Sequence, residues 1–285
     1  MKSNMKYVLA LSCGLLATVA NAAPMPMEKA FADADHVIYA PARGVQVPHN
    51  MDKSNLTNHG GGVLASPHVV YLFWGSVFCS GGSQTGYAST LQAFRNQFGG
   101  TGEYKTINQY GINFPGSLSG GTADAFDCSN PPTNVTDSTV HSHVTTYLAS
   151  HTFDNSAVYE VVIPSTSYSS SGSSTSCGGP SLAYCAYHGS YSTGGHTAKY
   201  SIQPWPGCSG CSVSGWSNVQ NQEHFVCHES REAITDPVNG WWDGSTGEEA
   251  DDKCAWSPSP FIGTNGYSYQ YEWSNSGSHC IKTTP

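Results

Sequence analysis

The segment from Ser217 to Pro237 constrains this chain more than any other, because its two ends specify a single long helix. Ser217 is a favourable N-cap and Pro237 cannot continue a helix, so we expect a helix between them that ends before the proline. Within it, His228 and Glu232 are four residues apart and share one face, with Glu229 beside them. One helical turn therefore presents an imidazole and two carboxylates together.

This turn predicts a metal site with an acid–base residue next to it. In the HExxH motif of zinc peptidases, two histidines four residues apart hold zinc and the glutamate acts as general base. Here Glu232 takes the place of the second histidine, and zinc also accepts carboxylate oxygen. We predict His228 and Glu232 as metal ligands and Glu229 as the general base that takes a proton from water. The alternative is a polar helix face that binds no metal.

Three acidic residues compete to be the third ligand. Asp236 lies eight residues after His228, about 80° around the helix, although an aspartate before proline often only shapes a turn. Glu249 and Asp252 belong to the acidic run 248–252, which could reach the helix or form a solvated surface loop. Asp236 and Asp252 are equally good candidates at this point. The carboxylates of the run would also suit Ca²⁺, bound for stability alone.

Other side chains have weaker claims on this site. His224 lies one turn before His228 and could extend the site, and His188 follows an apolar strand and could line a cleft. Tyrosines within 267–271 could steady an oxyanion, but such a run is more typical of packing. All five methionines lie at or before Met51, so a methionine turn after the helix is excluded.

Residues 1–22 are typical of a secretory signal peptide. Lys2 and Lys6 precede an apolar stretch from Tyr7 to Val19, and Ala20-Asn21-Ala22 forms a small-residue cleavage site. The apolar stretch is too short to span a bilayer, and no later segment approaches 18 apolar residues. We therefore expect an exported protein, extracellular or periplasmic, without membrane insertion.

The charge of the chain excludes some classes of partner. Only 11% of the residues are charged and the formal net charge is −9, which becomes −11 when Lys2 and Lys6 leave with the signal peptide. No basic patch is available to neutralise phosphates, so we expect neither nucleic acid nor anionic membranes as partners. The sequence does not indicate an oligomeric state.

Nine cysteines remain after the signal peptide, which is an odd number for an oxidising compartment. Close spacing suggests two of the pairs, the remaining positions suggest two more, and Cys227 is left as a buried, inert thiol. The expected pairs are Cys177–Cys185, Cys208–Cys211, Cys79–Cys128 and Cys254–Cys280.

The order of apolar runs and helical patterns predicts an α/β (α+β) fold, with helices packed on a mixed sheet in a layout like that of zinc peptidases. Residues 23–58 form an extended arm or propeptide, and 59–285 form a single catalytic-type domain that becomes irregular and disulfide-stapled from about 238. The expected helices are 87–98, 137–150 and 217–236; the expected strands are 69–74, 104–114, 157–163, 184–187, 199–203 and 267–271; and 165–181 is expected to be a surface loop.

Several segments between His59 and Cys254 together resemble one family. They are His59-Gly60-Gly61-Gly62-Val63-Leu64, Val70-Tyr71-Leu72-Phe73-Trp74-Gly75, Cys177 with Tyr184-Cys185-Ala186-Tyr187-His188, and His228-Glu229 to Pro237 followed by Gly240-Trp241, Glu249 and Asp252-Lys253-Cys254. They are similar to the plant phosphate-induced (Exordium-like) secreted proteins, and most closely to the bacterial relatives of that family.

The resemblance implies a secreted metallopeptidase, since the bacterial members look like enzymes of that kind. Plant members lack the His-Glu helix and are associated with the cell wall and growth. This chain departs from the bacterial pattern at Cys227, where serine is usual, and at Asp251, where glycine is common. Neither departure changes an expected ligand.

Two functions therefore remain open. The first is a secreted zinc-dependent peptidase acting on protein or peptide substrates, with the His228–Glu232 turn facing a divalent ion in an open cleft. The second is a non-catalytic protein of the extracellular matrix or cell wall, which contacts glycans through exposed tyrosine and tryptophan side chains. Metal content and hydrolysis distinguish them.

Overall fold

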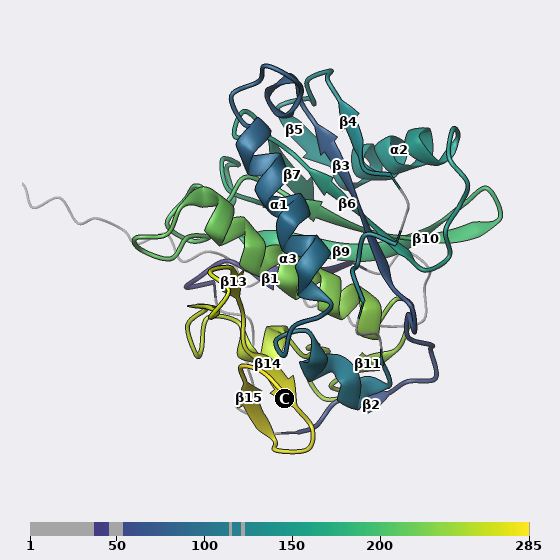
Figure 1. Ribbon diagram of the computed structural model, residues 1–285, viewed down its shortest axis with the longest axis vertical. Coiled ribbons are helices and arrows are strands. Elements are labelled where there is room, and N and C mark those ends of the chain that lie inside the picture. Colours follow the sequence, from purple (N-terminus) through teal and green to yellow (C-terminus); the bar gives the residue numbers. More distant parts are fainter. Residues whose placement is uncertain (1–36, 46–53, 114–115, 121–122, 285) are drawn as a thin grey trace, which may run out of the picture.

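The computed structural model describes residues 37–45, 54–113, 116–120 and 123–284. The expected signal peptide (1–22), and the parts 23–36 and 46–53 of the expected arm, lie outside the described residues. Within the described part, the chain forms a mixed α/β fold built around a six-stranded sheet (Figure 1). The coarse fold class is thus as expected, whereas the closer likeness to a zinc-peptidase layout stays a prediction.

The six-stranded sheet is parallel at its centre and antiparallel at one side. β10, β6, β3 and β4 run parallel to one another, while β9 is antiparallel to both β10 and β1. The strands are, in order across the sheet, β1 (Val37–Pro41), β9 (Tyr184–Thr193), β10 (His196–Gln203), β6 (Ala157–Val162), β3 (His68–Trp74) and β4 (Ala125–Asp127). Of these strands, β3 and β6 are almost continuously apolar, as strands covered on both faces require.

Helices cover both faces of this sheet. α1 (Thr85–Phe98) and α3 (Asn218–Thr235) pack on one face and α2 (Asp137–Leu148) packs on the other (Figure 1). The alternation of β3 shows this directly: Tyr71 and Phe73 join the core under α1 and α3, while neighbouring β3 residues join the core under α2.

Short elements complete the fold. The 3₁₀ helices are η1 (Ser76–Phe78), η2 (Lys105–Tyr110) and η3 (Asp252–Cys254). The small sheets pair β2 (Thr57–Asn58) with β11 (Trp241–Trp242), β12 (Phe261–Ile262) with β13 (Ser268–Tyr269), β14 (Glu272–Ser274) with β15 (His279–Ile281), and β5 (Asn134–Thr136) with β7 (Tyr168–Ser171) and then β8 (Ser174–Thr175). The region after α3 therefore consists of short pieces.

Two predicted segments differ from the structure. Residues 104–114, expected as a strand, contain η2 instead, because the buried side chains Tyr104, Ile107 and Tyr110 recur every third residue rather than every second. Residues 165–181, expected as a surface loop, include β7 and β8, in which Ser169 and Thr175 are buried.

The described part of the expected arm belongs to the folded body. β1 pairs with β9 at one edge of the main sheet, and β2 pairs with β11 directly after α3. This segment is therefore extended and is held by backbone hydrogen bonds. Whether residues 23–58 are removed as a propeptide stays a prediction.

Four disulfides staple the described residues, which fits an oxidising, extracellular compartment. The predicted pairs Cys79–Cys128 and Cys254–Cys280 are confirmed, and Cys227 is free and buried as expected.

The other two predicted disulfides are wrong: the structure pairs Cys177 with Cys208 and Cys185 with Cys211. The reason is the antiparallel β9–β10 pair, which returns the chain after β10 to the start of β9. The cysteines that are closest in sequence are therefore not the ones that are closest in space.

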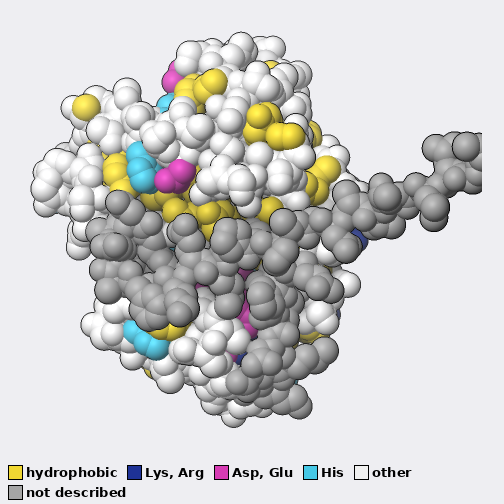
Figure 2. Space-filling model, turned by 180° about the vertical axis from the view of Figure 1, so that it is seen from behind, with side chains coloured by type: hydrophobic (Ala, Val, Ile, Leu, Met, Phe, Trp, Pro, Cys, Tyr) yellow, Lys and Arg dark blue, Asp and Glu magenta, His cyan; other side chains and the backbone are white. Residues whose placement is uncertain are grey.

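The described surface is mainly uncharged. Figure 2 shows one face on which polar and backbone atoms predominate, with scattered apolar side chains and few lysines or arginines. Among the described residues, no helix combines the length and the apolar character needed to cross a bilayer.

Candidate metal centre

α3 carries the candidate residues through the middle of the protein. Its start is a capping box: the Ser217 side chain accepts from the Gln220 backbone, and the Gln220 side chain accepts from the Ser217 backbone. Its end is at Thr235, before Pro237, as the sequence predicts. The helix packs against the sheet on one side and the C-terminal elements on the other, so that residues 221–235 are all buried.

The structure brings His228, Glu232 and Asp252 together, and we call them the primary group. The Nε2 atom of His228 lies 3.0 Å from Oε2 of Glu232 and 3.4 Å from Oδ1 of Asp252. None of these three atoms has a hydrogen-bond partner among the described residues. Tetrahedral zinc with bonds of about 2.0–2.2 Å separates its ligand atoms by roughly 3.3–3.6 Å. The 3.4 Å separation lies within this range and the 3.0 Å separation is shorter, so the three residues form a group that could hold a metal ion.

Neighbouring groups fix the orientation of these ligands. Nδ1 of His228 lies 3.2 Å from Oε1 of Gln270, whose amide nitrogen donates to the Asp251 carbonyl. The second oxygen of Glu232 accepts from the backbone N–H groups of Asp251 and Asp252, each at 3.0 Å. The side chains that carry the candidate ligand atoms are thus held by further hydrogen bonds, as metal ligands in proteins usually are.

His188 of β9 adds a second imidazole next to the primary group. Its Nδ1 lies 2.9 Å from Oε2 of Glu229 and 3.8 Å from Oε2 of Glu232, and its Nε2 lies 3.7 Å from Oε1 of Glu249. We call the primary group, His188, Glu229 and Glu249 together the cluster. The sequence indicated that His188 could line a cleft but did not connect it with Glu229, because the contact depends on how α3 packs against β9.

Of the candidates for third ligand, the structure brings Asp252 to His228 and not Asp236. Asp236 is the C-cap of α3, and its carboxylate accepts from the backbone N–H of Gly240 and so closes a turn. Among the described residues, Asp236 belongs to none of the groups of converging ligand atoms. The acidic run 248–252 is not a solvated loop either, since Glu249 is fully buried and Asp252 is 8% exposed.

The pKa values show how strongly the histidines and carboxylates interact. Burial alone would lower the pKa of the His228 imidazole, but Glu232 and other nearby carboxylates raise it well above its usual value. The pKa of His188 rises in the same way, chiefly because of Glu249. Burial raises the pKa of Asp252 to about 7 and that of Glu249 well above its usual range. Protons and a divalent cation therefore compete for the same atoms.

The other candidate residues have structural surroundings. His224 packs among the rings of Trp216, Phe225 and Trp256, and Tyr269 packs among the phenylalanines of α1. Three converging cysteines, Cys177, Cys208 and Cys211, are all engaged in disulfides and so are unavailable to a metal.

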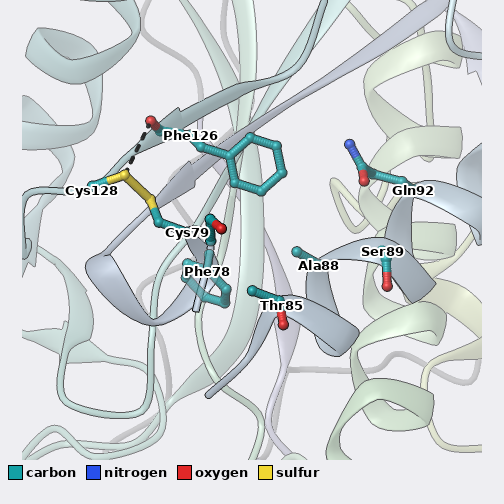
Figure 3. Close-up of a pocket in the computed structure, with 9 residues that line it drawn as sticks. Phe78, Cys79, Thr85, Ala88, Ser89, Gln92, Phe126 and Cys128 are labelled. Atoms are coloured by element: carbon teal, nitrogen blue, oxygen red, sulfur yellow. Dashed lines mark hydrogen bonds between the residues drawn. A yellow bond between two sulfur atoms is a disulfide. The ribbon is translucent and has the colours of Figure 1, made fainter. Parts of the chain in front are cut away.

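In the described part of the chain, the residues of the cluster are buried and are not exposed in the open cleft that we expected. The most accessible carboxylate of the primary group is Asp252, with 11% of its side chain exposed. A pocket of about 380 Å³ lies elsewhere, at the ends of β3 and β4 beside α1 (Figure 3). Phe78, Phe126 and the Cys79–Cys128 disulfide line it, and no member of the cluster does.

Comparisons with protein-family models, with curated proteins and with solved structures found no match to this chain. The candidate site is therefore defined by its own geometry, as a buried histidine–carboxylate centre on one helix, one strand and one loop.

Proposed function

We propose that this protein is a secreted zinc-dependent peptidase, with His228, Glu232 and Asp252 as zinc ligands and Glu229 as general base. The observation that carries the proposal is the convergence of three unpartnered, buried ligand atoms next to a further carboxylate. Three protein ligands with an open fourth position are typical of catalytic zinc, whereas structural zinc usually has four protein ligands.

The ion and Glu229 have different roles in the proposed reaction. A divalent ion at this position supplies Lewis acidity, which polarises a carbonyl and makes water more acidic. Glu229 follows His228 on α3, and its Oε1 has no hydrogen-bond partner, so this oxygen is free to accept a proton and pass it to the leaving amine. Its Oε2 contacts His188 at 2.9 Å, which holds the carboxylate in place.

The chemistry of the donor set favours zinc over calcium. Imidazole nitrogen with carboxylate oxygen suits zinc, while calcium binds through oxygen alone. The acidic run 248–252 contributes its buried carboxylates to the histidines of the cluster, which weakens the case for a separate calcium site there. The resemblance of the helix region to bacterial Exordium-like proteins supports the same activity.

One observation favours a second candidate function, a non-catalytic matrix or cell-wall protein with a structural ion. The cluster is almost completely buried, so a peptide reaches it only if the covering chain moves. A buried ion would stabilise such a protein without chemistry. Absence of zinc would still favour a non-catalytic protein, but if zinc is bound, only hydrolysis separates the two functions.

The test measures casein hydrolysis by the zinc-loaded protein and by Glu229→Gln, each with and without a chelator. We expect the chelator to abolish hydrolysis, and Glu229→Gln to bind zinc but lose activity by about 10²–10⁴-fold, the usual contribution of a general base. Glu223→Gln is the matched control, because Glu223 lies on the same helix but hydrogen-bonds to Ser268, outside the cluster. It should retain activity.

Two results would contradict the peptidase. Equal activity of the wild type and Glu229→Gln would remove the general base. A zinc-loaded wild type without activity on casein or a mixed peptide library would favour the non-catalytic protein.

A further inference from the structure

Several buried atoms of the cluster remain without a hydrogen-bond partner once an ion is assigned to the primary group. They are Nε2 of His188 and both carboxylate oxygens of Glu249. His188 is 2% exposed and Glu249 is fully buried. A buried polar atom without a partner costs about 1–3 kcal/mol, and more if it is charged. These atoms therefore require a ligand that the primary group does not supply.

The geometry around His188 matches that of a metal ligand. Its Nδ1 is held by a carboxylate, Glu229, just as Nδ1 of His228 is held by Gln270. Metal-binding histidines usually have this arrangement, which leaves the other nitrogen for the ion. Nε2 of His188 lies 3.7 Å from Oε1 of Glu249, which is too far for a hydrogen bond but close to the spacing of two ligands on one ion.

The charge of the cluster leads to the same conclusion. With neutral imidazoles, one divalent cation would leave two of the four buried carboxylate charges without compensation. Arg231, on the same helix, pairs with Asp251 and Glu272. Among the ion pairs of the described residues, none joins a lysine or arginine to a carboxylate of the cluster. When all four carboxylates are ionised, a second divalent cation would balance this charge; without it, the raised pKa values of His188 and Glu249 favour protons in its place.

We propose that the cluster holds two divalent cations, the first at the primary group and the second between Nε2 of His188 and the carboxylate of Glu249. Oε2 of Glu232 lies between the two imidazoles, 3.0 Å from Nε2 of His228 and 3.8 Å from Nδ1 of His188. Glu232 thus lies on the Nδ1 side of His188, whereas the second ion would bind at Nε2, so Glu232 is a ligand of the first ion only. The inference rests on the metal site of the proposed function but not on hydrolysis.

The test is zinc stoichiometry, measured on the disulfide-intact chain after removal of metal with a chelator. Zinc alone is titrated in by calorimetry, and bound zinc is counted by mass spectrometry after dialysis. We expect two ions per wild-type chain, and one in His188→Ala and in Glu249→Gln. His143→Ala is the control, because His143 stacks on Trp74 outside the cluster, and it should keep two. Circular dichroism confirms that each variant is folded.

The outcomes separate this inference from the proposed function. One zinc per wild-type chain, with hydrolysis that depends on Glu229, would overturn the second ion and leave the peptidase intact. Two zinc ions that persist in both variants would place the second ion elsewhere and overturn the proposed ligands. No zinc in the wild type would overturn both proposals. The wild-type count decides even if a variant fails to fold.

Discussion

Glu223 provides a sharp test of how α3 is buried. Its carboxylate is 2% exposed and accepts from the Ser268 backbone at 2.9 Å. Burial raises the pKa of Glu223 from 4.5 to about 7, although the Ser268 hydrogen bonds oppose the rise. Glu223→Gln replaces the carboxyl with an uncharged amide of the same shape, which can still accept from Ser268. The substitution therefore removes the titration and keeps the packing.

The sign of the effect follows from proton binding. Between about pH 4.5 and pH 7, the folded chain retains a proton on Glu223 that the unfolded chain has lost, so the free energy of unfolding falls as the pH rises. Each pKa unit corresponds to about 1.4 kcal/mol, so the shift of about 2.5 units gives a full loss of at most about 3.5 kcal/mol, nearly complete at about pH 8. Glu223→Gln lacks this loss and should be more stable than the wild type at pH 8.

The assay is urea unfolding of both proteins at pH 4.5, 6, 7 and 8, with a chelator present so that metal binding does not contribute. Subtracting the two curves cancels every other titrating group. We expect the advantage of Glu223→Gln to grow by about 2–3 kcal/mol between pH 4.5 and pH 8. Parallel curves for the two proteins would refute the reasoning, because Glu223 would then have the same pKa in both states.

Three further results are expected. Ser217→Ala removes the N-cap of α3 and should lower the free energy of unfolding by about 1 kcal/mol in the same urea assay, whereas no change would mean that the cap is redundant. Burial raises the pKa of the Cys227 thiol to about 12, so in the chain without residues 1–22 a thiol reagent should label no cysteine in the native state and one after denaturation; native labelling would contradict this burial. Gln270→Leu frees Nδ1 of His228 and should weaken zinc binding about 10–100-fold by calorimetry, and an unchanged affinity would exclude Gln270 as an orienting group.

The sequence predicts a helix or strand correctly where a short local pattern determines it. α3 was found through Ser217 and Pro237, since capping and proline chemistry act within a few residues. β3 and β6 were found because continuous apolar runs of that length suit buried strands. Local patterns do not predict the strand order or two of the disulfides, Cys177–Cys208 and Cys185–Cys211. Both depend on the pairing of β10 with β9, which brings the chain after β10 back to the start of β9.

In the candidate site, too, some residues are predicted by their spacing in the sequence and others are brought together only by packing. His228, Glu229 and Glu232 belong to one helical turn, so spacing alone brings them together. Asp252 was one of two equal candidates, and packing rather than spacing places it at His228. His188 lies 41 residues from its partner Glu229, and no local signal joins them. The one sequence feature that indicates a role for His188 is its position at the end of an apolar run. In the structure it lies within β9, and its neighbours in that strand are buried.

The burial of α3 links folding to ion binding. Residues 221–235 are all buried although they include several ionisable side chains, so each charge needs a partner. Arg231 pairs with Asp251, whereas the cluster contains more carboxylates than its two imidazoles can balance. A cation that binds only the folded chain adds about 4 kcal/mol of stability at a thousandfold excess over its Kd. Zinc should therefore stabilise the protein whichever function is right. Substitution of Glu229 separates the two functions, because a purely structural ion does not require a carboxylate oxygen that is free to accept a proton.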